Sequence, residues 1–467
     1  MFNVLNQQSK LTTNQKRIIA AAIIGDMLEF FDFFLMGFVL AFIVGPWHLT
    51  FGKSAVILLS AGIGAIFGAV FYGRLADAIG RRKVFMATVI NFSVATGILA
   101  LTPDGAWLFL AFFRFLVGFG VGGLYCVDLP LVQEFVPASK RGSISGLVTA
   151  AIPIGLLLGS FLGAFLAPVL GWRGLFATGL IPGLLTLLIR AWVPESPRWL
   201  VDQGRREEAR KSLAWALEVS PESLPLPPVT EPTPRPGFRD LFRHPRSLIA
   251  SWASNIGVQT GYYGFVLWAP TLLVLVLGVP AKRASFMMIF VGLGGFCGRL
   301  LVSAGSDLIG RKLTGGLAAL ASAVMLMVMA THHSGTIAGI PAFWVLMILT
   351  FIFADGIFAV LGPYSAEVWP TSLRATGMGS AYGFGGIGKV IGPWGLAVIV
   401  GSSNPVTPAA SIQKLVPSFG YLAAWYVLAA LVYLFIGAET KGRDLEEIDR
   451  QLLASAAERT QATRSGR

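Results

Sequence analysis

Ionisable side chains stand inside long apolar stretches of this sequence, where a charge is costly. Residues 18–45 hold Asp26, Glu29 and Asp32, and their three-residue steps spread them over about 120° of one helix face. Asp32 lies about 22 Å along such a helix from Arg17, at 1.5 Å per residue. A carboxylate at that depth in hydrocarbon either pairs with a cation or takes up a proton. We therefore predict reversible protonation at Asp32, with Glu29 and Asp26 as further candidates; a permanent ion pair is the alternative.

A lysine and several polar side chains in the second half of the sequence form another candidate site. Lys389 stands near the middle of the apolar stretch 376–400, among glycines, and an ammonium group there needs an anion. Asp355, in the stretch 341–366, is one candidate anion, and the carboxylate of a bound substrate is the other. Arg299 is expected nearer a membrane face, which a long side chain can reach. The neighbouring groups could bind a small polar molecule or join helices by hydrogen bonds; they are Gln259, Tyr262, Tyr263 and Tyr382.

The stretches that hold these residues have the length and composition of membrane-spanning helices. Residues 55–73 and 84–103 contain no charged residue, and about 20 apolar residues span a bilayer as a helix. Of the 467 residues, 55% are hydrophobic and 13% are charged, against about 25% charged in a soluble domain. The fold class is therefore an all-α membrane protein. We expect twelve transmembrane helices, at about 18–45, 54–73, 84–102, 106–134, 143–167, 174–193, 247–277, 284–306, 313–331, 341–366, 376–400 and 418–437.

Two charged turns divide the sequence into similar halves. The first is Gly73–Lys83 and the second is Asp307–Lys312, and Asp77 and Asp307 are 230 positions apart. We predict a short surface helix at 205–218, where charged and apolar residues alternate in a helical pattern. The predicted divisions are an N-terminal six-helix half at 1–193, a cytoplasmic linker at 194–245, a C-terminal six-helix half at 246–437 and a cytoplasmic tail at 438–467.

The basic residues gather on one side of the predicted membrane. Of the 36 Lys and Arg residues, 27 fall in segments predicted to be cytoplasmic and 5 in outer loops, which is the positive-inside bias of membrane proteins. The net charge of +12 therefore reflects topology, and we expect no nucleic-acid partner. We predict a multi-pass protein of a bacterial inner membrane that works as a monomer in the lipid bilayer, with both termini in the cytoplasm.

The charged turns resemble known sequence motifs. Gly73–Lys83 resembles the signature loop of the major facilitator superfamily, and Pro194–Leu200 and Glu439–Ile448 resemble its sugar-porter branch. Glu29–Phe33 with Gly37 is similar to proton symporters of metabolites and aromatic acids. The resemblance covers nearly the whole chain. It implies the major facilitator fold, with two pseudo-symmetric six-helix halves and a substrate site near the midplane where they meet.

Further residues gain a role from this resemblance. Arg114–Gly122 resembles the arginine-to-glycine motif of proton-coupled sugar porters, which implies that Arg114 faces an acid of helix 1. Helix 7 departs from sugar porters, because it has the single Gln259 in place of paired glutamines. Matched acids and cations at the helix ends imply a latch that closes the cytoplasmic side, with Asp77 near the positive end of a helix; alternatively, these charges only fix the topology. The predicted latch residues are Asp77, Arg81, Glu134, Arg141, Glu195, Arg198, Asp307, Arg311, Glu367, Arg374 and Glu439.

The sequence contains no pattern typical of a metal site, a cofactor site or an enzyme. His332 and His333 have no Cys or acid cluster nearby, and no phosphate-binding glycine-rich loop occurs. Cys126 and Cys297 are expected to be buried thiols. We predict a transporter for proton-coupled uptake of a small organic acid by alternating access, because Lys389 and the altered helix 7 favour an acid. A sugar or polyol proton symporter is the alternative, and a non-transporting nutrient sensor is a third hypothesis.

Overall fold

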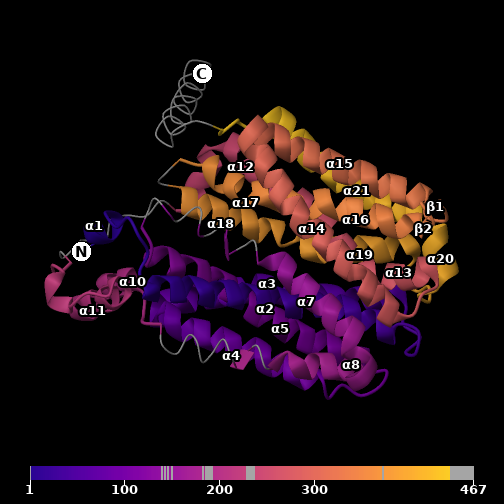
Figure 1. The fold of residues 1–467 in the computed structure, drawn as a ribbon, viewed down its shortest axis with the longest axis horizontal. Coiled ribbons are helices and arrows are strands. Elements are labelled where there is room, and N and C mark those ends of the chain that lie inside the picture. Colours follow the sequence, from indigo (N-terminus) through magenta and orange to yellow (C-terminus); the bar gives the residue numbers. More distant parts are fainter. Residues whose placement is uncertain are drawn as a thin grey trace. The chain divides into compact units, whose positions relative to one another are not determined.

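The computed structural model describes residues 2–137, 140, 144, 147–148, 151–180, 183–184, 193–227, 237–370 and 373–441. Helices make up almost all of the described chain, which holds one short β-hairpin (Figure 1). The chain divides into two compact units. Unit 1 comprises Met1–Trp47 and Val56–Thr233, and unit 2 comprises His48–Ala55 and Pro234–Arg467.

The long helices of unit 1 follow largely apolar stretches. The longest is α2 (Thr13–Ile43), which begins with a capping box. Thr12 Oγ1 accepts the Gln15 N–H, and Gln15 Oε1 accepts the Thr12 N–H, so two donors of the first turn are satisfied. The other elements are α1 (Phe2–Asn6), α3 (Phe51–Ile79), α4 (Arg81–Leu99), α5 (Trp107–Glu134), α7 (Ile152–Phe165), α8 (Ala167–Thr178), α10 (Pro197–Asp202), α11 (Arg206–Leu217) and η2 (Pro221–Ser223).

Unit 2 contains helices that are divided within a predicted span. The first such pair is α12 (Pro245–Val266) and α13 (Ala269–Leu277), which is bent by 47°. The other pairs are α16 (Ala342–Gly356) with α17 (Phe358–Glu367) and α18 (Arg374–Gly385) with α19 (Gly388–Val400). The remaining elements are η3 (Phe238–Arg243), α14 (Ala281–Ile309), α15 (Arg311–Thr331), β1 (Thr336–Ile337), β2 (Ile340–Pro341), α20 (Pro408–Gln413), α21 (Leu415–Leu431) and η4 (Val432–Ile436).

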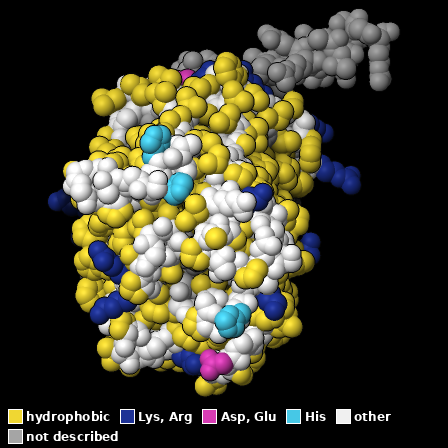
Figure 2. All heavy atoms as spheres, turned by 90° about the vertical axis from the view of Figure 1, so that its right-hand side faces the viewer, with side chains coloured by type: hydrophobic (Ala, Val, Ile, Leu, Met, Phe, Trp, Pro, Cys, Tyr) yellow, Lys and Arg dark blue, Asp and Glu magenta, His cyan; other side chains and the backbone are white. Residues whose placement is uncertain are grey.

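Many of these helices are suited to a bilayer. Among the described residues, seven are long and apolar enough to cross a membrane, or eight if α12 and α13 form one span. Large apolar side chains such as Phe67, Ile90 and Leu301 are exposed on the spans, and Figure 2 shows hydrophobic side chains over much of the face in view. Such exposed apolar surface marks contact with lipid or another protein.

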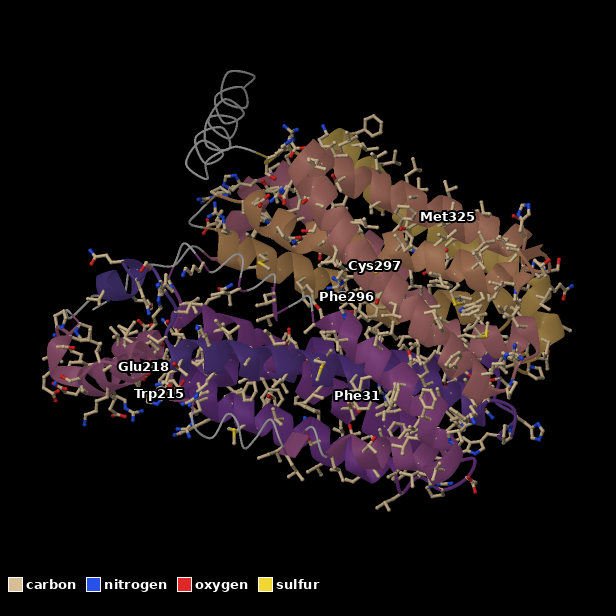
Figure 3. All side chains as sticks on the ribbon, in the orientation of Figure 1. Phe31, Trp215, Glu218, Phe296, Cys297 and Met325 are labelled. Atoms are coloured by element: carbon tan, nitrogen blue, oxygen red, sulfur yellow. The ribbon has the colours of Figure 1, made fainter. Side chains whose placement is uncertain are left out.

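The thiol of Cys297, on α14 (Figure 3), is exposed. The prediction that it is buried is therefore wrong. An apolar stretch shows that a helix lies in the membrane, but a stretch that is apolar all round does not show which face meets lipid. The side chain of Cys126 lies outside the described residues.

The two charged turns have the same backbone geometry, as the sequence repeat predicts. The helices that precede them, α3 and α14, are each 29 residues long. Gly80 and Gly310 follow with φ of 104° and 96°, and α4 and α15 begin at the next residue. Only glycine adopts such a φ without strain, so the sharp turn between the helices depends on it.

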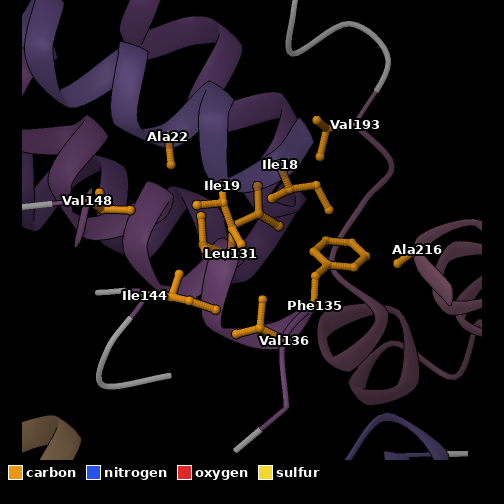
Figure 4. Packing of buried hydrophobic residues seen from close by; sticks show 11 residues of the cluster. Ile18, Ile19, Ala22, Leu131, Phe135, Val136, Ile144, Val148, Val193 and Ala216 are labelled. Atoms are coloured by element: carbon orange, nitrogen blue, oxygen red, sulfur yellow. The ribbon is translucent and has the colours of Figure 1, made fainter. Parts of the chain in front are cut away.

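The predicted surface helix is present as α11, but one face of it is buried. Ala216 of α11 joins a cluster formed by the ends of α2 and α5 and the residues around them (Figure 4). The cluster comprises Ile18, Ile19, Ala22, Leu131, Val132, Phe135, Val136, Ile144, Val148, Val193 and Ala216.

The start of α2 also holds α11. Thr12 and Asn14 donate side-chain hydrogen bonds to the carbonyls of Ala216 and Trp215, which belong to the last turn of α11. Glu218, beside Trp215 in Figure 3, accepts the backbone N–H of Asn14 at 2.9 Å. Residues 228–236 of the predicted linker lie outside the described residues, as does the tail after Lys441.

Candidate functional site

The three acids of α2 are buried. Asp26, Glu29 and Asp32 are each at most 3% exposed. Asp32 is contacted by side chains of α4 and α5. Its surroundings therefore involve three helices.

Arg114 of α5 is the cation that lies beside Asp32. Its Nη1 is 3.7 Å from Asp32 Oδ2. Nη1 and Nη2 also donate to the backbone carbonyls of Asp32 and Phe33, each at 3.0 Å. Thr96 of α4 donates to Asp32 Oδ1 at 3.0 Å. Arg114 is therefore held chiefly by the backbone of α2, and it meets the carboxylate only at ion-pair distance.

This geometry leaves one oxygen of Asp32 available for a proton. Among the described residues, no donor forms a hydrogen bond to Asp32 Oδ2. A carboxylate oxygen without a donor can itself carry a proton and become a donor, which removes a charge that is costly in this environment. Arg114 would keep both of its carbonyl bonds, since they do not depend on the charge of the acid. The arrangement can therefore alternate between an ionised and a neutral Asp32.

Lys389 of α19 is buried between two tyrosine rings. It is 7% exposed, and its Nζ lies 5.0 Å from the ring centroid of Tyr263 and 5.6 Å from that of Tyr382. Both distances are within the range of cation–π attraction. Gly388 allows this part of α19 to approach α12, because a Cβ there would come within 2.6 Å of the Thr260 nitrogen. Three predicted site residues thus lie together.

The side chain of Arg299 is buried and paired within the protein, so the expectation that it extends to a membrane face is wrong. It is 8% exposed, and its Nε and Nη2 donate to the two oxygens of Asp355 at 2.8 and 3.2 Å. The sequence already indicated that Arg299 lies far from the charged turn, because it precedes Arg311 by about 18 Å of helix at 1.5 Å per residue. Asp355, predicted as a partner of Lys389, is therefore occupied by a bidentate arginine.

Tyr262 and Gln259 of α12 are both buried, in different surroundings. The ring of Tyr262 packs edge-on against Phe358 and Phe351, with centroids at 4.9 and 5.9 Å. Gln259 donates to Asn255, one turn earlier on the same helix. Tyr262 thus packs among aromatic rings, whereas Gln259 belongs to a polar row along α12.

A charged cluster lies at the turn of unit 1. Glu195 accepts the backbone N–H groups of Arg81 and Arg82 at 3.0 and 3.1 Å, so it caps the N-terminus of α4. The Arg81 Nη1 lies 2.6 Å from Glu134 Oε1, and Ser196 donates to the other oxygen of Glu134. The acid at the positive end of this helix is therefore Glu195.

Two other predicted latch residues of unit 1 are exposed, namely Asp77 and Arg198. Asp77 contributes its backbone carbonyl, which accepts the Trp199 Nε1–H at 2.9 Å. Arg141 lies outside the described residues.

Unit 2 repeats the cluster with different residues. Glu439 accepts the backbone N–H groups of Arg311 and Lys312 at 2.9 and 3.2 Å. The Arg311 Nε lies 3.6 Å from Glu367 Oε2, and Thr440 donates to Glu367. Thr440 takes the place of Ser196, and neither hydroxyl group was predicted from the sequence. The signal was that each directly follows a capping glutamate.

The remaining predicted residues of this end of unit 2 differ in exposure. Asp307 is 72% exposed and pairs with Arg311 at 3.0 Å, one turn away on the chain. Arg374, the first residue of α18, is half-buried. Among the described residues, no group of three or more His, Cys, Asp or Glu side chains could hold a metal ion.

Known proteins match this chain over most of its length. The family described as "Sugar (and other) transporter" matches residues 18–452. The niacin transporter NiaP of Acinetobacter baylyi is 30% identical, covering 91% of this chain and 94% of that protein. The cis,cis-muconate transport protein of the same organism is 26% identical, and the match covers 83% of this chain and 88% of that protein. Among solved structures, the inward open xylose transporter XylE from E. coli has a TM-score of 0.71 at 21% identity. The match covers 94% of this chain and 99% of that protein. All of these proteins are transporters, and none is an enzyme.

Proposed function

Because this chain belongs to the sugar (and other) transporter family, we propose that it is a secondary active transporter that takes up a small organic acid together with protons. Its long apolar helices make it a multi-pass membrane protein, and its relatives transport small molecules. Beyond transport itself, we propose the chemical class of the substrate, protons as the coupling ion and uptake as the direction of transport. Transport proceeds by alternating access between the two halves.

The observation that carries the proposal is the buried ammonium of Lys389 between Tyr263 and Tyr382. A carboxylate can make a charge-assisted hydrogen bond to it, and the two rings offer apolar surface to the rest of a small molecule. Asp355, the other anion predicted for Lys389, already accepts two hydrogen bonds from Arg299. Two of the relatives are named as transporters of niacin and cis,cis-muconate. Both compounds are carboxylic acids, which supports an organic acid as the substrate.

Proton coupling is assigned to Asp32. Its Oδ2 has no hydrogen-bond donor in the described part of the chain, and Arg114 is anchored by backbone carbonyls at 3.0 Å. A shape change that moves α5 relative to α2 would alter the distance between Arg114 and the carboxylate. A nearby cation favours the ionised form, so such a change would release or bind a proton. Glu29 and Asp26 are the alternative carriers.

The charged clusters are proposed as a latch on the cytoplasmic side. Arg81 with Glu134 and Arg311 with Glu367 tie helix ends together within each unit, and Glu195 and Glu439 fix the turns. Breaking such contacts would free the helix ends to separate.

Uptake into proteoliposomes tests the function directly. Purified protein is given labelled aromatic acids, aliphatic acids and sugars, with and without an inward pH gradient. We expect an acid to accumulate only with the gradient, and protein-free liposomes are the control. Accumulation of a sugar but of no acid would overturn the substrate class, and acid accumulation that ignores the gradient would overturn the coupling.

The orientation is proposed from the distribution of Lys and Arg, with both termini and the linker in the cytoplasm. A reporter enzyme fused after residue 220 should then be active in the cytoplasm, and one inserted at Pro405 should be active on the outer side. The opposite pair of readings would overturn the proposed orientation.

A further inference from the structure

A row of hydrogen bonds ends at Gln259 with an oxygen that has no donor. Gln259, Asn255 and Ser365 are 0%, 2% and 3% exposed. Among the described residues, no donor forms a hydrogen bond to Gln259 Oε1. A buried acceptor without a donor is destabilising, by an amount comparable to a lost hydrogen bond, and such exceptions in native proteins call for an explanation.

The row has a direction that starts at the backbone of α17. Ser365 Oγ donates its single proton to the Leu361 carbonyl at 2.6 Å. Its oxygen can then only accept, and it accepts the Asn255 Nδ2–H at 2.7 Å. The same Asn255 nitrogen donates to the Ser251 carbonyl at 2.8 Å. Both protons of the Asn255 amide are thereby used, so its orientation is fixed.

That orientation fixes Gln259 in turn. The Oδ1 of Asn255 faces the next turn of α12, where the Gln259 Nε2 donates to it at 3.3 Å. If the Gln259 amide were reversed, two oxygens would face each other. Gln259 Oε1 is therefore fixed as an acceptor, and a ligand can satisfy it only with an O–H or N–H donor.

The amide also lies close to Lys389. A Cβ on Gly385 would come within 2.3 Å of Gln259 Nε2 and 2.8 Å of the Asn255 Cβ, so the amide rests on the bare backbone of Gly385. Lys389 follows Gly385 by one turn, about 6 Å of helix. Tyr263, which contacts Lys389, follows Gln259 by one turn on α12. One small molecule can therefore reach both the ammonium and the amide.

We propose that Gln259 Oε1 is a specificity determinant, and that the substrate is a carboxylic acid bearing an O–H or N–H donor about one ring-width from its carboxylate. This inference rests on the carboxylate site at Lys389 proposed above. The carboxylate binds Lys389 and the donor binds Gln259. Asn255 and Ser365 are positioning residues, because they act only by orienting the Gln259 amide. An acid of the same shape without the donor would leave the acceptor unsatisfied and bind more weakly.

Matched ligands test the inference in the full-length protein. The dissociation constants of 4-hydroxybenzoate and 4-methoxybenzoate are measured for the wild type, Gln259→Met and Gln259→Glu. We expect the wild type to prefer the hydroxy acid by roughly 5- to 100-fold, the effect of leaving one buried group unsatisfied. Gln259→Met should lose this preference while its affinity for the methoxy acid stays close to that of the wild type. Gln259→Glu should not restore the preference, because one of its carboxylate oxygens would face Asn255 Oδ1.

A control and a second variant separate specificity from damage to the fold. Gln413→Met makes the same change at an exposed position of α20 and should leave both constants unchanged. Gly385→Ala keeps Gln259 but displaces its amide, and it should also reduce the preference.

The inference is overturned if the wild type binds the two acids equally, or if Gln259→Met keeps the wild-type ratio. In either case the organic-acid function still stands, because the acids bind. If neither acid binds and a sugar does, the inference and the proposed function are both overturned.

Discussion

Replacing Lys389 by methionine isolates the contribution of its charge. Methionine keeps an unbranched apolar stem and removes the ammonium. The rings of Tyr263 and Tyr382, whose centroids are 5.0 and 5.6 Å from Nζ, stay available to the substrate. A hydrogen bond to a charged group contributes about 1.5–3 kcal/mol. We therefore expect the dissociation constant of a substrate acid to rise roughly 10- to 150-fold.

The assay compares a substrate acid with its uncharged amide. Dissociation constants of both are measured for the wild type, Lys389→Met and Lys389→Arg. If the ammonium binds the carboxylate, Lys389→Met weakens the acid and leaves the amide nearly unchanged, whereas Lys389→Arg keeps part of the affinity for the acid. Lys414→Met, at an exposed lysine, is the matched control.

Two results would refute this reasoning. The first is an equal loss of affinity for the acid and the amide, which would mean that Lys389 maintains the shape of the site. The second is restored transport in the double variant Lys389→Ala, Asp355→Ala, which would mean that Lys389 only neutralises Asp355. We expect no restoration, because Asp355 is bound by Arg299.

Three further predictions concern coupling, capping and the latch. Asp32→Asn should exchange substrate in counterflow but not accumulate it under a pH gradient, because it cannot release a proton; accumulation at the wild-type level would assign coupling to another acid. Glu195→Gln and Glu439→Gln should each lower stability by about 1–2 kcal/mol, because a charged helix cap becomes neutral; thermal unfolding in detergent measures this, and an unchanged midpoint would contradict the capping role. Asp77→Asn should impair transport while substrate still binds and should increase labelling of a cysteine probe on the cytoplasmic side; unchanged transport and labelling would show that this acid is no part of the latch.

The fold could be predicted because its determinants are local in sequence. Apolar length gives the spans, and the turns around Gly80 and Gly310 show the repeat. The major facilitator fold is confirmed by the family match and by the likeness to the xylose transporter. The position of Arg114 beside Asp32 agrees with the prediction, which came from a motif. Helix breaks were missed, because a bent helix and a straight one have the same apolar composition.

Contacts between helices were harder to predict. Arg299 and Asp355 are 56 positions apart, and pairing them requires the rotation and depth of two helices at once. Thr12 and Ala216 meet across 204 positions, and no periodicity within one helix indicates such a contact. Exposure of Cys297 was missed for a similar reason, since lipid and protein interiors are both apolar.

The two buried arginine–aspartate pairs are suited to different tasks. Asp355 receives hydrogen bonds on both oxygens from Arg299, so protonating it would break a bidentate contact between the side chains. In the described part of the chain, the carboxylate of Asp32 receives one hydrogen bond, from Thr96, and Arg114 is held by the backbone instead. Protonation there costs the ion-pair attraction at 3.7 Å but no hydrogen bond of the arginine. The geometry therefore favours a fixed structural pair at Asp355 and a proton switch at Asp32, although both acids are equally buried.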